Sequence, residues 1–325
     1  MGEAPKPEGE YLKYSTVTGY FLQDDLETDP STFDYATTGF GLKSQAYDTD
    51  ADYDPEGTKS QWQRFDYKVS QLNHESDANI EYKVLYMGRH GQGYHNVAEE
   101  IYGTEAWDCY WSLQEGDGNI RWADALLTQA GIEQAKRANT FWNSLIQEHK
   151  AQTPQSYYTS PLLRCMQTAN ITFSGVDLPA DSPFIPLIKE LLRESIGVHT
   201  CDRRSSKTVI HEKYPNWPFE EGFREEDPLW SSTLRETHAA QEQRTKIVLD
   251  DIFSKDKNTH ISISSHSGEI TAILRVVGHR DFGLSTGQMI PALVKIERVK
   301  GTLPPIEELP WDKPKICTEP PELLN

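Results

Sequence analysis

Two short β-prone segments each run directly into a histidine, and this pairing constrains the fold more than any other feature of the chain. Residues 82–87 lead to Arg89 and His90, and residues 261–265 lead to His266. Apolar and β-branched residues bounded by glycine and polar residues are typical of buried strands that end in loops. Because ligands bind at the carboxyl ends of the strands in an open α/β sheet, we expect the two histidines to converge at that edge.

Helix signals lie between the two segments. Apolar residues recur at helical spacing after Thr128, and Ser160 followed by proline predicts a helix start that places Arg164 in the first turn. The run Thr233–Glu236 has the form of a capping box and predicts a third helix. Because strands and helices of these lengths alternate, we expect an α/β fold, a three-layer sandwich on a mostly parallel sheet.

The 325 residues have room for one large α/β domain with additions. Residues 1–79 form an acidic N-terminal extension, and its interleaved aromatic side chains indicate that it packs on the core. Residues 80–300 hold the strand and helix pattern, with a loop-rich insertion at about 195–232 that we expect to act as a lid over the sheet edge. Residues 301–325, rich in proline and acid, predict an extended surface strap.

Charge and cysteine content exclude several classes of partner and site. Fifty Asp and Glu residues against 32 Lys and Arg give a net charge of −18, which disfavours binding to nucleic acid and to anionic membranes. The N-terminus lacks the apolar core of a signal peptide, and no apolar run approaches about 18 residues. The four cysteines include no C-x-x-C pair. We therefore expect a reduced, intracellular protein, cytoplasmic with the nucleus as an alternative.

The order of several short motifs resembles that of one known family. Arg89-His90-Gly91 with Asn96, directly after the first strand, is similar to the opening motif of the histidine phosphatase superfamily, the phosphoglycerate-mutase-like proteins. Further segments of that pattern follow in order at residues 127–135, 159–169, 192–197 and 265–268. The similarity covers about residues 82–299, and residues 192–204 with the early arm look most like the fungal phosphomutase-like subgroup. The resemblance implies a phosphoglycerate-mutase-like fold.

The same residues suit phosphoryl transfer, which needs a nucleophile in line with phosphorus and positive donors on the phosphoryl oxygens. His90 can attack phosphorus as a neutral imidazole and form a phosphohistidine. Arg89 and Arg164 can bind phosphate oxygens as planar forks, and their charge keeps His90 unprotonated. His266, Asn96, the N–H groups that follow His90 and the helix after Ser160 are further expected phosphate contacts. A histidine at a strand end also has an ordinary structural explanation.

The family resemblance assigns the role of proton donor to Glu194, and a carboxyl group beside a phosphate dianion is protonated more readily than one in water. A surface ion pair would explain the same glutamate, and Asp202 is the second choice for the donor. Contacts to the rest of the substrate are expected from Tyr94, His199, Arg203 and Arg204. The two arginines would equally fit a solvated pair.

No metal or cofactor is expected, because the glycine-rich run after the first strand lacks the last glycine of a dinucleotide loop and no H-E-x-x-H motif exists. The first hypothesis is a phosphatase that hydrolyses a small phosphomonoester through phospho-His90. A phosphoglycerate-type mutase is the alternative, since a dry pocket would return the phosphoryl group to a second hydroxyl. A third is a catalytically vestigial phosphate-binding interaction module. The sequence does not determine the oligomeric state.

Overall fold

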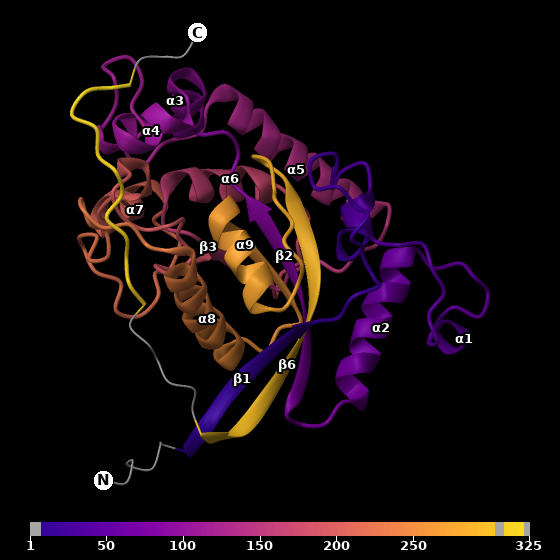
Figure 1. The fold of residues 1–325 in the computed structure, drawn as a ribbon. Helices are drawn as coiled ribbons and strands as arrows, with labels where there is room; N and C mark the ends of the chain where they lie inside the picture. The colour runs from indigo at the N-terminus through magenta and orange to yellow at the C-terminus, as the bar shows by residue number, and fades with distance from the viewer. Residues whose placement is uncertain (1–7, 303–308, 322–325) are drawn as a thin grey trace, which may run out of the picture.

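In the computed structural model, which describes residues 8–302 and 309–321, strands form one six-stranded sheet in the order β1-β6-β2-β5-β3-β4 (Figure 1). The strands are β1 (Glu8–Thr16), β2 (Ile80–Arg89), β3 (Ser156–Thr159), β4 (Leu187–Ile188), β5 (His260–Ser265) and β6 (Met289–Thr302). Strands β2, β5, β3 and β4 are parallel, and β6 pairs antiparallel with β1 and β2. The mostly parallel sheet is therefore confirmed. Expectations for the N-terminal leader and for residues 303–308 and 322–325 fall outside the described residues.

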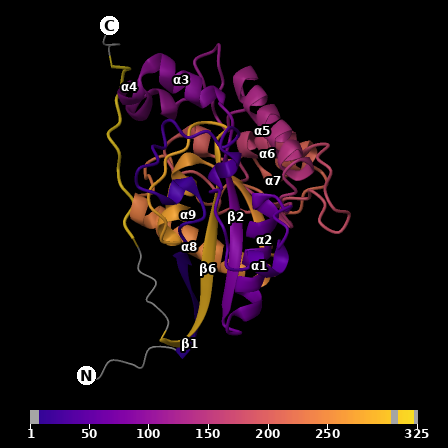
Figure 2. The same cartoon turned by 90° about the vertical axis from the view of Figure 1, so that its right-hand side faces the viewer.

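Helices lie around this sheet and give the α/β architecture expected from the sequence. Those of the described residues are α1 (Asp50–Tyr53), α2 (Gln61–Glu75), α3 (Tyr94–Tyr102), α4 (Thr104–Cys109), α5 (Gln129–Gln147), α6 (Leu163–Phe173), α7 (Lys207–Lys213), α8 (His238–Lys255) and α9 (Ser267–Val276). Figure 2 shows α2, α5 and α6 on one side of β2 and β6, with α8 and α9 on the other. Within the described chain, no helix is long and apolar enough to cross a membrane.

Two of the predicted helix starts can be compared at the level of single hydrogen bonds. Thr128 caps α5 as predicted, because its Oγ1 accepts a hydrogen bond from Gly131 N at 3.1 Å. The start predicted at Ser160 was wrong, since α6 begins at Leu163. Ser160 Oγ lies 2.8 Å from His266 Nε2 at the sheet edge, and it also accepts a hydrogen bond from Leu162 N in the turn before the helix. Arg164 still falls in the first turn of α6.

The capping box predicted at Thr233–Glu236 was also wrong. Helix α8 begins at His238, and Thr237 caps it by accepting a hydrogen bond from Ala240 N at 3.2 Å. The side chain of Glu236 is taken up by a tertiary contact, because both of its oxygens accept hydrogen bonds from Arg244 at 2.8 Å. The buried ion pair with Arg244, eight residues along the chain in α8, therefore takes the side chain that the capping box would have used.

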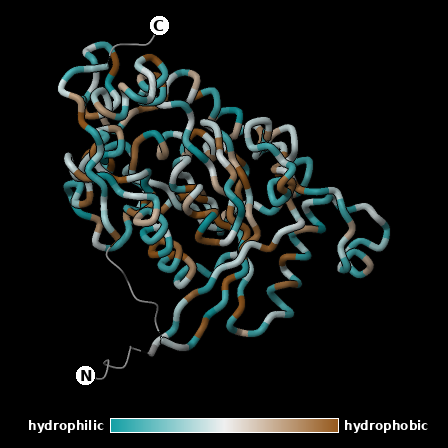
Figure 3. The backbone as a smooth tube through the Cα atoms, viewed as in Figure 1, coloured by the Kyte–Doolittle hydropathy of each residue, from teal (hydrophilic) through white to brown (hydrophobic). Residues whose placement is uncertain are grey.

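The N-terminal extension contributes side chains to the same core as the sheet. Phe21, Tyr35 and Phe40 are buried, and the ring of Phe40 packs edge-on against Phe141 and Trp142 of α5, with centroids 4.7 and 5.3 Å apart. Strand β1 of the extension forms one edge of the sheet. Figure 3 shows hydrophobic backbone segments concentrated along the central strands and hydrophilic ones on the loop around α1.

Two of the four cysteines form a disulfide, so the expectation of a fully reduced chain was wrong. Cys109, the last residue of α4, is bonded to Cys317 in the C-terminal tail. The tail reaches α4 because it runs along the molecule and pairs at Asp312 with Arg235 (Figure 1). The two cysteines are 208 residues apart, and spacing alone cannot show such a pairing.

The insertion at residues 195–232 packs on α6. It contains the short 3-10 turn Thr200–Asp202 and helix α7. Its apolar side chains form a small second core with residues of α6 and β4, which comprises Leu163, Met166, Ala169, Ile188, Ile210, Trp217 and Phe223. The insertion is therefore a folded cap with its own apolar contacts.

We predict that Phe40→Ala lowers the free energy of unfolding by about 3–5 kcal/mol, because it empties a buried aromatic site shared by the extension and α5. Urea unfolding followed by tryptophan fluorescence measures this change. Tyr53→Ala is the control, since Tyr53 lies outside that cluster, stacks on Tyr67 and has Lys59 Nζ 5.9 Å from its ring centroid, with an expected loss of about 1 kcal/mol. Equal losses in the two variants would show that the extension is not part of the cooperative core.

Candidate active site

Side chains from separate segments meet at the carboxyl ends of β2 and β5. Arg89 ends β2 and is paired in register with Ser265, the end of β5, so His90 and His266 follow at the same edge. The centroids of the two imidazole rings lie 5.1 Å apart. Arg164 joins them from the first turn of α6 and lowers the pKa of both histidines. Parallel pairing of the two strands explains why residues so distant in sequence converge.

The loop after His90 is held tightly against the start of α5. A Cβ atom on Gly91 would collide with the backbone of Gly131, and one on Gly131 would collide with the backbone of Gln92. Gly91 N donates a hydrogen bond to Thr168 Oγ1 at 3.0 Å, so this N–H is not free to bind phosphate. Glycine is required here by the close approach of loop and helix.

Both arginines have part of their hydrogen-bonding capacity unused, Arg164 as a fully buried residue and Arg89 as a half-buried one. Arg164 is 1% exposed and donates to Cys201 O at 2.6 Å and to Asp202 Oδ1 at 2.9 Å, but its Nε has no partner. Arg89 donates to Leu284 O at 2.6 Å, and its Nε is likewise buried without a partner. Unpaired N–H groups on buried cations are costly, and an anion that accepts from them would remove the cost.

Burial and positive charge keep the site histidines neutral. Desolvation first, and then Arg164 and Arg89, hold the pKa of His90 well below its usual value. The pKa of His266 is lowered well below its usual value by burial and then mainly by Arg164. Nε2 of His266 lies 2.8 Å from Ser160 Oγ and 3.3 Å from Cys165 Sγ. A neutral imidazole retains the lone pair that a nucleophile needs.

Glu194 lies between the insertion and the start of α9. Its Oε1 accepts a hydrogen bond from Ser195 N at 2.9 Å, and its Oε2 accepts one from Gly268 N at 3.0 Å. A Cβ atom at position 268 would collide with this carboxylate, so glycine is needed for the approach. Burial lowers the pKa of Arg89, and the charge of Glu194 acts in the opposite direction. The carboxylate is therefore close enough to interact electrostatically with Arg89.

Asp202, the second choice for the proton donor, is instead the internal counter-ion of Arg164. It is 3% exposed, and burial alone would raise its pKa. Arg164 and Arg235, with nitrogens 2.9 and 3.4 Å from its oxygens, outweigh burial and lower the pKa. A carboxylate that is kept ionised has no proton to give, so Asp202 does not suit the role.

Two further expected phosphate contacts are engaged elsewhere in the fold. Asn96 Oδ1 accepts a hydrogen bond from Gly93 N at 2.9 Å and thereby caps α3. At the start of α6, Leu163 N donates to Asp124 Oδ1 at 2.9 Å, so this helix end already has an anionic partner. A phosphate contact from the amide nitrogen of Asn96 stays a prediction.

A cavity of about 490 Å³ adjoins the first turn of α6. Tyr94 and Leu163 line it together with residues of the 119–126 loop and residues 203–205. The Arg203 side chain pairs with Glu115 at 2.5 Å and stacks over Trp230, with its guanidinium carbon 5.0 Å from the ring centroid. Of the expected substrate contacts, Tyr94, Arg203 and Arg204 therefore border one open space.

Bordering this cavity does not leave Arg204 available to a substrate, and His199 lies elsewhere. Every N–H of the Arg204 guanidinium is hydrogen-bonded within the protein, to Glu190 and to backbone carbonyls of residues 205 and 224–226. No donor of Arg204 is left for a substrate. His199 lines a separate cavity beside α4 and the tail, and burial first, then Arg235, lowers its pKa to about 4.

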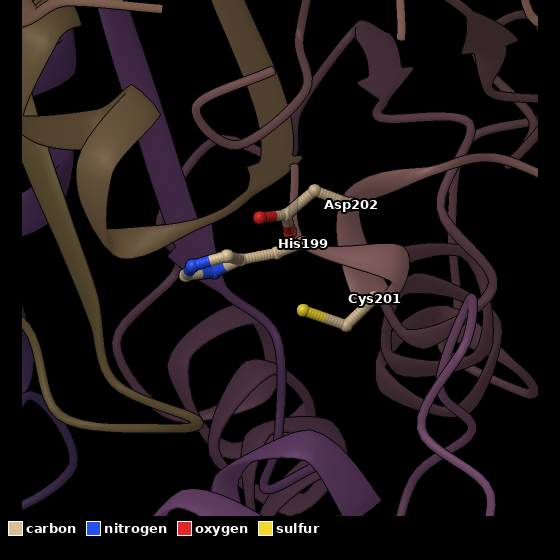
Figure 4. A group of neighbouring side chains, drawn as sticks. All are labelled: His199, Cys201 and Asp202. Carbon is tan, nitrogen blue, oxygen red and sulfur yellow. The ribbon is translucent and has the colours of Figure 1, made fainter. Parts of the chain in front are cut away.

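Figure 4 shows His199, Cys201 and Asp202, whose potential ligand atoms lie within 4.8 Å of one another. The cluster does not suit a cation. Its carboxylate is already paired with Arg164 and Arg235, and the two guanidinium charges oppose a metal ion at that place. Burial raises the pKa of the Cys201 thiol well above its usual value, which disfavours the thiolate that a metal would bind.

Comparison with known proteins gives one matching family model and several similar proteins. A family model described as Histidine phosphatase superfamily (branch 1) matches residues 110–290. A protein of Arthroderma benhamiae named "Probable phosphoglycerate mutase" is 54% identical over 286 residues, 88% of this chain and 85% of that protein. "Phosphomutase-like protein 3" of Candida albicans is 36% identical, covering 96% and 89%. Phosphoglycerate mutase from Thermus thermophilus aligns with a TM-score of 0.35 at 20% identity, over 64% of this chain and 91% of that one.

The lowered histidine pKa values predict acid sensitivity. Below about pH 6.5 the unfolded chain binds a proton on each such histidine, and the folded protein does not. The free energy of unfolding therefore decreases as the pH falls below about 6.5, by up to about 1.4 kcal/mol per pH unit for each histidine. Urea unfolding at pH 7 and pH 5.5 should show a smaller acid loss for His266→Gln than for the wild type. His149→Gln, at an exposed position, should match the wild type. The same acid loss in all three proteins would contradict the assignment.

Proposed function

Because the chain belongs to the histidine phosphatase superfamily (branch 1), we propose that it hydrolyses a small phosphomonoester through a phosphohistidine on His90. Family membership supports chemistry of the phosphatase or mutase type, and hydrolysis is our choice between the two. The observation that supports it best is the pair of buried, unpaired Nε–H groups on Arg89 and Arg164, next to an imidazole held neutral. These donors suit the oxygens of a bound phosphoryl group.

In the proposed reaction, hydrogen bonding selects the attacking nitrogen of His90. His90 Nδ1 lies 2.7 Å from Gly91 O, and a carbonyl oxygen only accepts, so Nδ1 carries the proton. The lone pair is then on Nε2, which attacks phosphorus as the bond from phosphorus to the ester oxygen breaks. Arg89, Arg164 and His266 bind the remaining phosphoryl oxygens while the charge on them shifts.

Glu194 is the proposed proton donor for the ester oxygen that leaves. In the second step it takes a proton from water, the water oxygen bonds to phosphorus, and the bond from phosphorus to Nε2 of His90 breaks to release inorganic phosphate. The anchoring of the carboxylate by Ser195 N and Gly268 N supports a fixed position for this group. A metal ion has no role in either step.

We propose that the organic part of the substrate occupies the cavity beside Tyr94 and Arg203. The net charge of −18 favours a small phosphorylated molecule over nucleic acid as partner. The cytoplasmic location remains a prediction from the sequence, and the Cys109–Cys317 disulfide weighs against it because reducing compartments keep thiols reduced.

A phosphoglycerate-type mutase is the second candidate, and the name of the relative that is 54% identical favours it. The same clamp and nucleophile serve a mutase, provided that the phosphoryl group returns to a substrate hydroxyl before water reaches it. The third hypothesis, a vestigial binding module, is not supported by the intact set of Arg89, His90, Arg164 and His266 at one sheet edge.

We predict that His90→Ala abolishes phosphate release from p-nitrophenyl phosphate, because the phosphohistidine cannot form. The wild-type protein should release phosphate and acquire an acid-labile label on His90 when it is quenched during turnover. His149→Gln is the matched control with wild-type rates. The same assay with 3-phosphoglycerate and a bisphosphorylated primer separates the two candidates, and rapid isomerisation with little phosphate release would overturn hydrolysis as the main activity.

We predict that Glu194→Gln lowers kcat/KM for alkyl phosphates by about 100-fold or more and for p-nitrophenyl phosphate far less, since a good leaving group needs no proton. Steady-state kcat/KM for a series of leaving groups measures the effect, because it reports the first step and excludes the attack of water, in which Glu194 also takes part. Equal slowing across the series would assign Glu194 to positioning and leave the proton donor to another group.

A further inference from the structure

A third histidine lies within the site, and the proposed mechanism makes no use of it. His95 is the second residue of α3, is 8% exposed, and has its ring centroid 5.3 Å from that of His90. The ring of His90 therefore has two imidazole neighbours from different segments, His95 from α3 and His266 from the end of β5.

One ring nitrogen of His95 is unpaired. Its Nδ1 is buried and has no hydrogen-bond partner among the described residues. An unsatisfied polar atom of this kind costs about 1–3 kcal/mol, and native proteins rarely keep one without a reason. The Nε atoms of Arg89 and Arg164 are in the same condition, so orphan nitrogens of three side chains gather around one nucleophile.

A glycine makes room for this ring. A Cβ atom on Gly93 would lie 2.7 Å from His95 Nδ1 and 2.8 Å from its Cε1. Gly93 has φ −99° and ψ 165°, values that any residue adopts, so the backbone does not require glycine there. The space at position 93 is used by the imidazole, which indicates that the fold holds His95 in a defined place.

The charges that face His95 come from every element packed around it. Burial first, then Arg164, His90, Arg89 and His199, lower its pKa well below the usual value, so the free protein holds it neutral. A tetrahedral dianion bound at the two arginines would reverse this field. The imidazole would then take a proton from solvent and present two N–H donors instead of one.

We propose that His95 binds the phosphoryl group directly, takes up one proton when the dianion enters, and donates an N–H···O bond to a phosphoryl oxygen. This proposal rests on the proposed function for the identity of the ligand, but binding without turnover is enough to test it. His95 would complete an anion clamp of Arg89, Arg164, His266 and His95 around the Nε2 atom of His90.

Tungstate is the probe, because it is a tetrahedral dianion that carries no proton at neutral pH. Calorimetric titration of the full chain at pH 7.5, in two buffers of different ionisation enthalpy, gives both the affinity and the number of protons taken up. The proposed mechanism also protonates Glu194 beside the bound dianion, so proton uptake is compared in a Glu194→Gln background, where we expect uptake of close to one proton. Adding His95→Gln should abolish that uptake and weaken binding about 10–100-fold, as expected for a hydrogen bond to a charged group. His149→Gln should behave as the wild type.

Gly93→Ala tests the position of the ring separately. It should weaken tungstate binding in the wild-type background, because the added methyl group displaces His95, and should have no effect in a His95→Ala background. The proposal is overturned if His95→Gln binds tungstate with wild-type affinity, or if proton uptake persists in His95→Gln and disappears in Glu194→Gln. If His95→Gln fails to fold, the imidazole ¹⁵N shifts of the wild type provide the test. The proposal is then overturned if no histidine becomes protonated when tungstate is added.

These outcomes are independent of turnover. A protein that binds tungstate through His95 but releases no phosphate from any ester would refute the proposed hydrolysis and leave the His95 assignment standing. A protein that hydrolyses esters normally and whose His95→Gln variant binds tungstate with wild-type affinity would do the reverse.

Discussion

The site depends on the burial of two guanidinium groups beside neutral imidazoles at the end of two parallel strands. Arg89 and Arg164 bring positive charge into a region with little water, and that charge together with desolvation keeps His90 and His266 unprotonated. The same burial leaves N–H donors without partners. The proposed nucleophile, a neutral His90, and the proposed anion-binding N–H groups of the arginines therefore have the same physical cause.

Asp202 links that arrangement to the outer parts of the molecule. Its carboxylate pairs with Arg164 inside the site and with Arg235 outside it. The backbone of Arg235 is paired with Asp312 in the tail, and the tail is fixed to α4 by the Cys109–Cys317 disulfide. Asp202 of the insertion therefore connects Arg164 of the proposed phosphate clamp, through Arg235, to the C-terminal tail. Because Asp202 is the counter-ion of both arginines, it is unsuited to donate a proton.

Local patterns predicted elements well where no distant group competed for the same atoms. Thr128 caps α5 as its sequence indicates, because distant Gln92 accepts its hydroxyl hydrogen and leaves its oxygen to accept from Gly131 N. Ser160 and Glu236 carry equally clear local signals, yet His266 and Arg244 use these side chains, and the helices begin later. Tertiary hydrogen bonds to buried groups outweigh capping, which contributes about 1 kcal/mol.

The sequence by itself determined the α/β class, the strands that end at His90 and His266, and the family, because these follow from periodicity and from residue types at fixed spacing. Only the tertiary structure decided which donors are free. Arg203 and Arg204 are adjacent, alike in sequence and border the same cavity, but every guanidinium N–H of Arg204 is bound inside the protein, while the Arg203 guanidinium pairs with Glu115 and stacks over Trp230. Availability depends on neighbours that folding brings from far along the chain, and this holds equally for the Cys109–Cys317 pair and for the unpaired ring nitrogen of His95.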